Sequence, residues 1–223
     1  MPLVIQSGMN DIIADSAYPA NKIATADERT LDVIRQRWSP RAFSGRAVTT
    51  DDLIPLFDAA RWAASCFGEE PWRFIVATKA DPAQHETMLG CLAEANQAWA
   101  KDAPVLLLTV ARKNFTHNNR PNFYALHDTG MALANLMLQA VSMGFYAHAM
   151  GGFDRERARV AYAIPDDYEL GAAVAIGYLG DLSTLPEKAV KTELAARSRK
   201  PLSEIVFESA WANPAAFCPM RRV

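Results

Sequence analysis

The chain has 223 residues, of which 50% are hydrophobic and 22% charged, and its formal net charge is −2. This length and composition suit one globular domain, and a nearly neutral chain offers no global field to attract nucleic acid or an acidic membrane. Its three cysteines have no CxxC pair and its four histidines no metal-ligand spacing, so we expect no disulfide framework, no metal site and a reducing, cytoplasmic setting. The apolar segments fall short of the ~20 residues of a membrane span, so no membrane partner is expected.

Residues 1–24 show weak periodicity and are expected to form an extended N-terminal arm. Thr25 and Glu28 fit a capping box, which predicts a helix from Thr25 that ends at Pro40. Its expected apolar face consists of Leu31, Ile34 and Trp38. A second helix is predicted from Thr49 or Thr50 to about Ala64, because two aspartates occupy its first turn.

Strands and helices then follow one another along the chain. Apolar runs predict strands at residues 73–78, 104–111, 144–149 and 170–180, and helices are predicted near 82–100, 123–143 and 154–162. The continuously apolar strands are expected to be covered on both faces. This order predicts an α+β domain over residues 25–223, with a small mixed or antiparallel sheet flanked by helices.

The segment 127–143 is apolar on almost every side of its helix. Such a helix is either the centre of the monomer or half of a dimer interface, and we favour the interface because obligate interfaces resemble a core cut in half.

Two basic clusters lie near the two ends of the chain. The first holds Arg35, Arg37 and Arg41 around Ser39, and the second holds Arg197 and Arg199. Guanidinium groups suit phosphate or carboxylate, although each cluster alone reads more simply as solvated surface charge. Together they would form a phosphate site if the fold brought them into contact.

Two further segments could approach a ligand. Gly151 and Gly152 follow a predicted strand, where glycines admit a ligand close to the backbone, or they form an ordinary turn capped by Asp154. The loop SCFGEE, residues 65–70, precedes a strand, where binding groups usually lie, and Trp72 behind it is expected in the core.

Taken in order, these segments resemble the FMN-dependent nitroreductase family. The family's R-x-S-x-R/K-x-F element stands here as residues 37–43, and its A-P-S-x-x-N-x-Q-P-W-x-F loop as residues 63–74. A long apolar helix ending at Gly144, a glycine turn at 151–154 and a basic R-x-R-x-P element at 197–201 complete the pattern.

The resemblance implies a cofactor site for FMN. Arg37 and Ser39, with Arg197 and Arg199, would hold the phosphate, and Arg41 would lie near the ribityl chain. The flavin ring would be faced by Ser65, Gly68 and Glu70, by N–H groups of Gly151 and Gly152 near N5, and by Asn96 at the pyrimidine edge. Their neighbours Trp38, Cys66 and Met150 complete the expected cofactor-binding set. No side chain is expected to be catalytic, because the flavin itself would carry the chemistry.

The same resemblance implies a homodimer with exchanged C-terminal arms, residues 201–223 covering the partner and the two basic clusters meeting across the dimer. The implied reaction is ping-pong: NAD(P)H reduces FMN, which then reduces a nitroaromatic, a quinone or another small organic acceptor.

The chain departs from the family loop at three positions. Ala64 replaces Pro, Gly68 replaces Asn and Glu70 replaces Gln. An ionised Glu70 can only accept hydrogen bonds and would disfavour a reduced, anionic flavin, so we expect a lowered flavin potential. These departures leave open a flavin-binding protein without turnover, and a flavin-free dimerisation module that binds another anion is a third reading.

Overall fold

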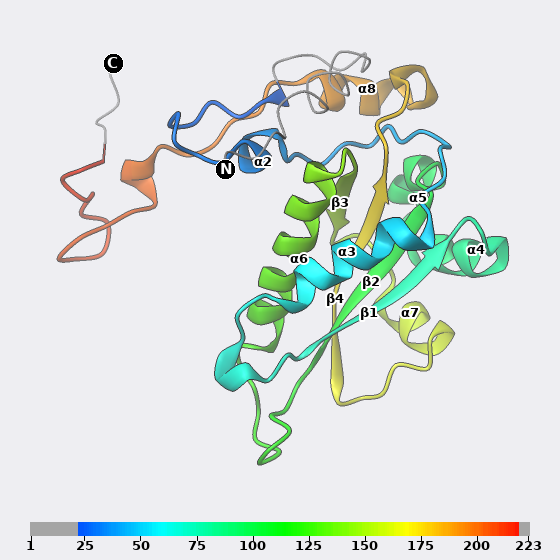
Figure 1. Ribbon diagram of the computed structural model, residues 1–223, viewed down its shortest axis with the longest axis horizontal. Coiled ribbons are helices and arrows are strands. Elements are labelled where there is room, and N and C mark those ends of the chain that lie inside the picture. Colours follow the sequence, from blue (N-terminus) through cyan, green and yellow to red (C-terminus); the bar gives the residue numbers. More distant parts are fainter. Residues whose placement is uncertain (1–21, 219–223) are drawn as a thin grey trace, which may run out of the picture.

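A four-stranded sheet lies at the centre of the computed structural model, which describes residues 22–218 (Figure 1). The strand order is β1-β2-β4-β3, and every neighbouring pair is antiparallel. The strands are β1 (Trp72–Thr78), β2 (Val105–Arg112), β3 (Tyr146–Met150) and β4 (Tyr168–Gly177). All four agree with the predicted strands, and the α+β class is confirmed.

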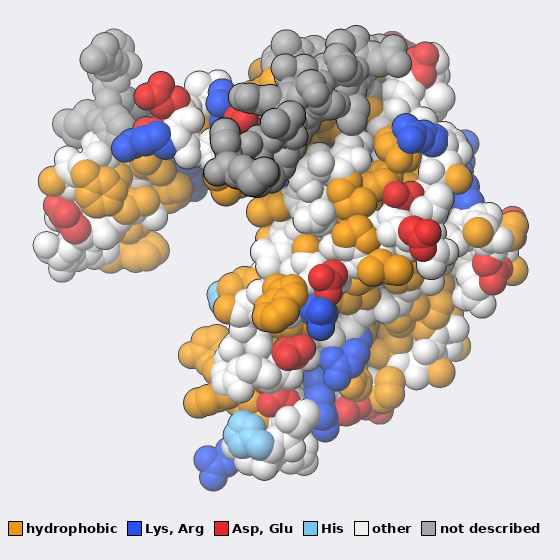
Figure 2. Space-filling model, in the orientation of Figure 1, with side chains coloured by type: hydrophobic (Ala, Val, Ile, Leu, Met, Phe, Trp, Pro, Cys, Tyr) orange, Lys and Arg blue, Asp and Glu red, His pale blue; other side chains and the backbone are white. Residues whose placement is uncertain are grey.

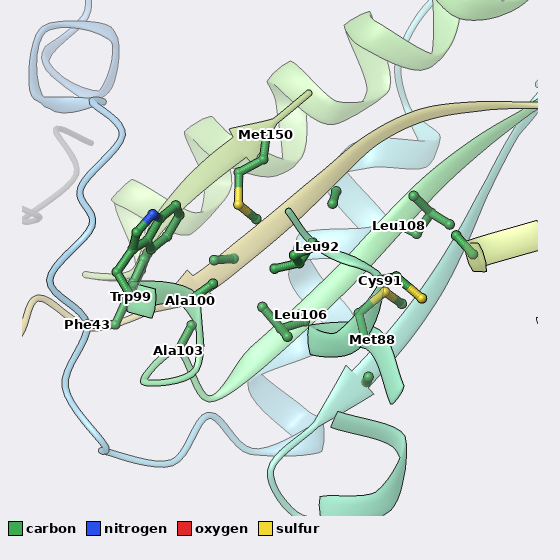
Figure 3. Packing of buried hydrophobic residues seen from close by; sticks show 14 of the residues in the cluster. Phe43, Met88, Cys91, Leu92, Trp99, Ala100, Ala103, Leu106, Leu108 and Met150 are labelled. Carbon is green, nitrogen blue, oxygen red and sulfur yellow. The ribbon is translucent and has the colours of Figure 1, made fainter. Parts of the chain in front are cut away.

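Helices cover both faces of this sheet. Helices α3 (Thr50–Arg61) and α6 (Ala125–Ser142) pack on one face, where Leu107 and Val174 point toward them. Helices α4 (Pro82–Cys91), α5 (Glu94–Ala100) and α7 (Arg155–Ala161) pack on the other face, over the alternate side chains of the same strands. Figure 3 shows this second cluster, with Met88, Trp99 and Met150 among its members.

Among residues 22–218, the remaining elements are short. They are α2 (Asp32–Gln36), α8 (Glu187–Leu194) and the 3₁₀ turns η2 (Cys66–Gly68), η3 (Leu182–Thr184) and η4 (Leu202–Glu204). In the part of the chain that the structure describes, no helix combines the length and apolarity needed to cross a membrane.

Burial decides which strands are covered on both sides. Strand β2 is buried from Val105 to Ala111, as its apolar sequence predicts. Strand β1 lies at an edge of the sheet, and its Arg73 and Val76 are exposed. The prediction of two covered faces is therefore wrong for β1. Trp72 lies in the core as predicted, at 5% exposure.

The first predicted helix is much shorter than expected. Only Asp32–Gln36 is helical, and the presumed capping box at Thr25 is absent. Asp27 instead accepts hydrogen bonds from the backbone N–H and the guanidinium of Arg29, and its own carbonyl accepts from the Thr30 N–H. These local bonds offer the backbone an alternative to the helix, and the predicted inner residue Leu31 is 66% exposed.

The helix predicted over 82–100 is divided in two. Leu92 and Ala93 have extended conformations between α4 and α5. The Ala93 N–H donates to the Gly152 carbonyl, so the chain leaves the helix to bind the turn after β3. The helix at Thr50 begins as predicted, with a capping box between Thr49 and Asp52.

Helix α6 is buried on one side only. Ala132, Leu136 and Ala140 are fully buried, whereas Leu126 is 47% exposed and Ala134 also faces solvent. The first alternative, a helix at the centre of the monomer, is therefore wrong for this chain. An apolar side of the helix stays open, and the expected dimer interface remains a prediction.

The chain after α8 leaves the body of the molecule. In Figure 1 the segment from about residue 201 extends outward, and Figure 2 shows hydrophobic side chains gathered on it. Trp211 is 89% exposed and packs against Phe207 at a ring-centroid distance of 5.3 Å. Residues 1–21 of the expected N-terminal arm and residues 219–223 of the expected C-terminal extension lie outside the described residues.

Candidate functional site

The two basic clusters meet within one chain. The Arg197 guanidinium donates hydrogen bonds to the carbonyl of Lys22 at 2.6 Å and to that of Arg35 at 3.0 Å. In return, the Lys22 ammonium donates to the Ala195 carbonyl at 2.6 Å. The expectation that these clusters would meet across a dimer is therefore wrong. The fold itself joins residues 22–41 to residues 193–199.

A hollow of about 370 Å³ lies where these segments meet. Its polar and charged lining consists of Lys22, Arg37, Ser39, Arg41, Thr192, Glu193, Arg197, Ser198 and Arg199. The predicted residues Arg37, Trp38, Ser39, Arg41, Arg197 and Arg199 all belong to it. Arg35, the third arginine of the first cluster, pairs with Asp32 at 3.5 Å instead.

Crowding of cations sets the electrostatics of the hollow. Burial, followed by the charges of Arg197 and Arg199, lowers the pKa of Arg37. Burial and Arg199 likewise lower the pKa of Arg197. The pKa of Lys22 is also lowered, by burial first, although the nearby Glu193 carboxylate opposes that change. Because each cation is destabilised by its neighbours, a bound dianion would relieve the repulsion.

Glu193 is the carboxylate inside this basic site. It is 1% exposed, accepts a hydrogen bond from the Arg41 N–H at 2.8 Å, and lies 3.6 Å from the Arg41 guanidinium. Arg41 is thus already paired with a buried anion. It lines the hollow, yet the remaining arginines are better placed to neutralise a ligand.

Strand β3 leads from the basic hollow to the double glycine. Trp38 packs edge-on against Tyr146 at 6.1 Å, and the neutral ring of His148 donates from Nδ1 to the Pro40 carbonyl at 2.8 Å. His148 also lies 4.7 Å from the ring of Trp99. Gly152 lies four positions after His148, on the order of 13 Å along an extended strand. The basic hollow and the glycine turn therefore lie along the same edge of the sheet.

The glycine turn is held by a residue far away in the sequence. Asn96 Nδ2 donates to the Gly152 carbonyl at 2.9 Å, so two predicted site residues from separate elements meet. Gly151 and Gly152 are exposed, and Asp154 caps α7 by accepting from the Arg157 N–H. The capped-turn alternative is confirmed, and it leaves the glycines open to a ligand. Met150 is 4% exposed, so its side chain belongs to the core rather than to a site wall.

The loop of residues 65–70 lies at the opposite edge of the sheet. It precedes β1, whereas the glycines follow β3, and the two intervening strands separate these edges by on the order of 14 Å. One chain therefore does not bring Ser65, Cys66, Gly68 and Glu70 to the glycine turn. Within the loop, the Ser65 hydroxyl accepts from the Glu70 N–H at 3.1 Å.

Comparison with known proteins identifies the fold. The sequence pattern described as "Nitroreductase family" matches residues 34–178, well over half of the chain. The chain belongs to the nitroreductase family. A crystal structure described as an oxidoreductase containing FMN has a TM-score of 0.80 and 35% identity, covering 87% of this chain and 100% of that one.

Relatives of this nitroreductase-family chain are found in several organisms. An uncharacterized 15.4 kDa protein of Mycolicibacterium smegmatis is 37% identical over 148 residues, covering 64% of this chain and 99% of that relative. Protein DrgA of Synechocystis sp. is 31% identical over 178 residues, covering 66% and 83%. A Methanothermobacter thermautotrophicus protein, provisionally named NADH dehydrogenase/NAD(P)H nitroreductase, is 29% identical over 154 residues, covering 66% and 76%.

Two charged residues that line the hollow, Lys22 and Glu193, are not among the predicted site residues. Lys22 falls within the expected N-terminal arm, yet it is 7% exposed and its ammonium lies 4.9 Å from the Trp38 ring centroid. Glu193 lies on α8, a helix that was not predicted. A proline followed by Glu187 in the first turn was the available signal for that helix.

Proposed function

We propose that this nitroreductase-family protein is an FMN-dependent oxidoreductase that carries electrons from NAD(P)H to a nitroaromatic, a quinone or another small organic acceptor. The observation that carries the proposal is the convergence of Lys22, Arg37, Arg197 and Arg199 on one hollow, at one end of the strand that leads to Gly151. The name of the FMN-containing structural relative supports the cofactor, and that of the Methanothermobacter thermautotrophicus relative supports the nicotinamide donor.

The donor set of the hollow fits an FMN phosphate. Guanidinium groups and the Ser39 hydroxyl are the donors that phosphate oxygens accept from, and mutual repulsion among the cations favours a dianion over a neutral ligand. Arg37, Ser39, Arg197 and Arg199 would hold the phosphate. Lys22 adds an ammonium whose remaining N–H groups are available beyond its bond to Ala195.

When bound, FMN would supply the redox chemistry, and the protein would supply position and electrostatics. The glycine turn would let backbone approach the flavin ring, with Asn96 bracing the turn from α5. No side chain has to act as acid or base for this role.

A homodimer would complete the site. The loop 65–70 lies on the far sheet edge, so a second copy is needed to bring it to the flavin of the first. The open apolar side of α6 and the outlying extension from residue 201, with exposed Trp211 and Phe217, support such pairing. Free thiols at Cys66, Cys91 and Cys218 agree with a reducing cytoplasm.

An absorption spectrum of the purified protein tests the proposal. We expect a flavin spectrum, release of FMN on denaturation, and anaerobic bleaching by NADH or NADPH followed by recovery with a quinone. Bound FMN that no nicotinamide bleaches would instead indicate a flavin-binding protein without turnover. A colourless protein that does not take up added FMN would overturn the assignment.

A further inference from the structure

The loop 65–70 has an unusual backbone conformation. Phe67, Gly68 and Glu70 all have positive φ angles, of 56°, 66° and 48°. For residues other than glycine this region costs free energy, and it persists only where surrounding contacts enforce it. The loop therefore depends on neighbours that hold it.

One neighbour is helix α6. Asp128 in the first turn of α6 is 2% exposed and accepts a hydrogen bond from the Cys66 N–H at 2.9 Å. This bond fixes the beginning of the loop. Beyond it, the Gly68 N–H donates to the Ser65 carbonyl and the Glu69 N–H to the Cys66 carbonyl, both at 3.1 Å, so these two bonds hold the turn from within the loop.

The second neighbour is the hairpin of residues 113–122, which follows β2. Its two arms pair through a bridge between Asn114 and Pro121, and the Phe115 N–H donates to the Arg120 carbonyl at 2.9 Å. The hairpin thus has its own backbone bonds and can serve as a support.

A carboxylate joins this hairpin to the loop. The Glu69 side chain is 4% exposed, and its Oε1 accepts from the Thr116 N–H at 2.6 Å. Its other oxygen lies 3.7 Å from Nδ1 of His117. The Asn118 amide lies 2.9 Å from His117 Nε2, which places the ring proton on Nδ1, facing Glu69.

Aromatic packing adds a second connection at the same place. The Phe67 ring lies 5.8 Å from Phe115 and 6.1 Å from His117, and these two rings lie 5.4 Å from each other. Phe67 is itself 85% exposed, so the hairpin supports the edge of this ring while its outer face stays open.

We propose that the hairpin 113–122 is a positioning element for the flavin-facing loop, latched by the bond from the Thr116 N–H to the Glu69 carboxylate. This inference rests on the proposed flavin function. Glu69 is a positioning residue: its carboxylate turns away from the loop surface into the hairpin, and it acts by holding Phe67, Gly68 and Glu70 in their left-handed conformations. The latch should contribute to recognition of the flavin ring and not to that of the phosphate.

The test compares Glu69→Ala with Glu69→Gln, which keeps an acceptor oxygen, and with Glu86→Ala, an exposed carboxylate on α4 as the matched control. Amide hydrogen exchange of the full-length chain reports on the loop. Titration with riboflavin measures the affinity for the flavin without its phosphate, and titration with FMN measures the affinity for the flavin with its phosphate.

We expect Glu69→Ala to speed exchange in residues 65–70 about tenfold and to weaken riboflavin and FMN binding by the same factor, about tenfold. Glu69→Gln should recover most of both effects, and Glu86→Ala should match wild type. A general structural defect would speed exchange along the whole chain, whereas loss of the latch should speed it only in residues 65–70 and the hairpin that holds them.

Each contrary result has its own meaning. Unchanged loop exchange in Glu69→Ala overturns the latch, whatever the flavin titrations give. Faster exchange with unaltered riboflavin affinity overturns the positioning role. A wild-type protein that binds neither flavin overturns the proposed function, and with it the flavin role of the loop. The exchange data would still show whether Glu69 holds the loop.

Discussion

The guanidinium of Arg197 donates a hydrogen bond of 2.6 Å to the carbonyl of Lys22, a residue 175 positions earlier in the chain. The Lys22 ammonium returns a bond to Ala195, and the two segments enclose the cationic hollow between them. The proposed phosphate site is therefore assembled from the two ends of one subunit.

Removing one cation from the hollow should weaken FMN but not riboflavin. Arg37→Ala deletes a guanidinium that makes few bonds within the protein, the closest being 3.4 Å from the Ser39 hydroxyl. Loss of a charged hydrogen bond to phosphate should raise the FMN Kd roughly 10- to 100-fold. Fluorescence titration with both flavins checks this, and Arg29→Ala, whose guanidinium pairs with Asp27 in an exposed turn, is the matched control. Equal losses for the two flavins would contradict a phosphate role.

The two glycines of the turn should respond differently to alanine. A Cβ on Gly152 would lie 2.8 Å from Asn96 Nδ2, so Gly152→Ala should disturb the bond from Asn96 and destabilise the fold by about 1 kcal/mol. A Cβ on Gly151 meets no atom within 4 Å, so Gly151→Ala should retain wild-type stability yet impair flavin binding through its methyl group. Urea unfolding and FMN titration measure the two effects. Full flavin affinity in Gly151→Ala would argue against a close approach of the ring to this turn.

Stability should fall in mild acid because of His148. Burial, with the nearby Arg41 and Arg37 charges, lowers the pKa of His148 to about 4, although its bond to Pro40 opposes the change. The unfolded chain takes up this proton near pH 6.5 and the folded chain only near pH 4, so folding stability is lost as the pH falls through this interval, by about 3 kcal/mol. Urea unfolding gives the free energy of unfolding at each pH between 7.5 and 4.5. This free energy should fall less steeply with decreasing pH in His148→Gln than in wild type. A slope equal to that of wild type would reject this origin.

Glu70 should lower the reduction potential of the bound flavin. Its backbone is fixed twice, by the Ser65 hydroxyl and by the Arg73 guanidinium, which donates to its carbonyl at 3.0 Å. A carboxylate near the ring disfavours a reduced anion, so Glu70→Gln should raise the midpoint potential, on the order of 20 mV for one solvent-exposed charge. Spectroelectrochemical titration of both proteins measures the difference, and no rise in the variant would refute the idea.

Local sequence patterns predict most of the strands and helices of this fold. The four strands and the helices at Thr50, Ala125 and Arg155 were predictable because apolar runs, caps and acidic first turns act over a few residues. The same local reasoning failed at Thr25, where the Asp27 side chain competes for the backbone, and at Leu92, where the chain turns to meet Gly152. Both failures come from partners that a periodicity pattern does not contain.

The sequence by itself determined the family, the chemical character of both basic clusters and the glycine turn, because these depend on residue types in a fixed order. Only the tertiary structure decided that the clusters close on each other within one subunit, that Glu193 and Lys22 belong with them, and that the loop 65–70 lies on the opposite sheet edge from Gly151. The reason is physical: side-chain chemistry is local, but the burial and close approach of charges depend on contacts between residues more than 150 positions apart.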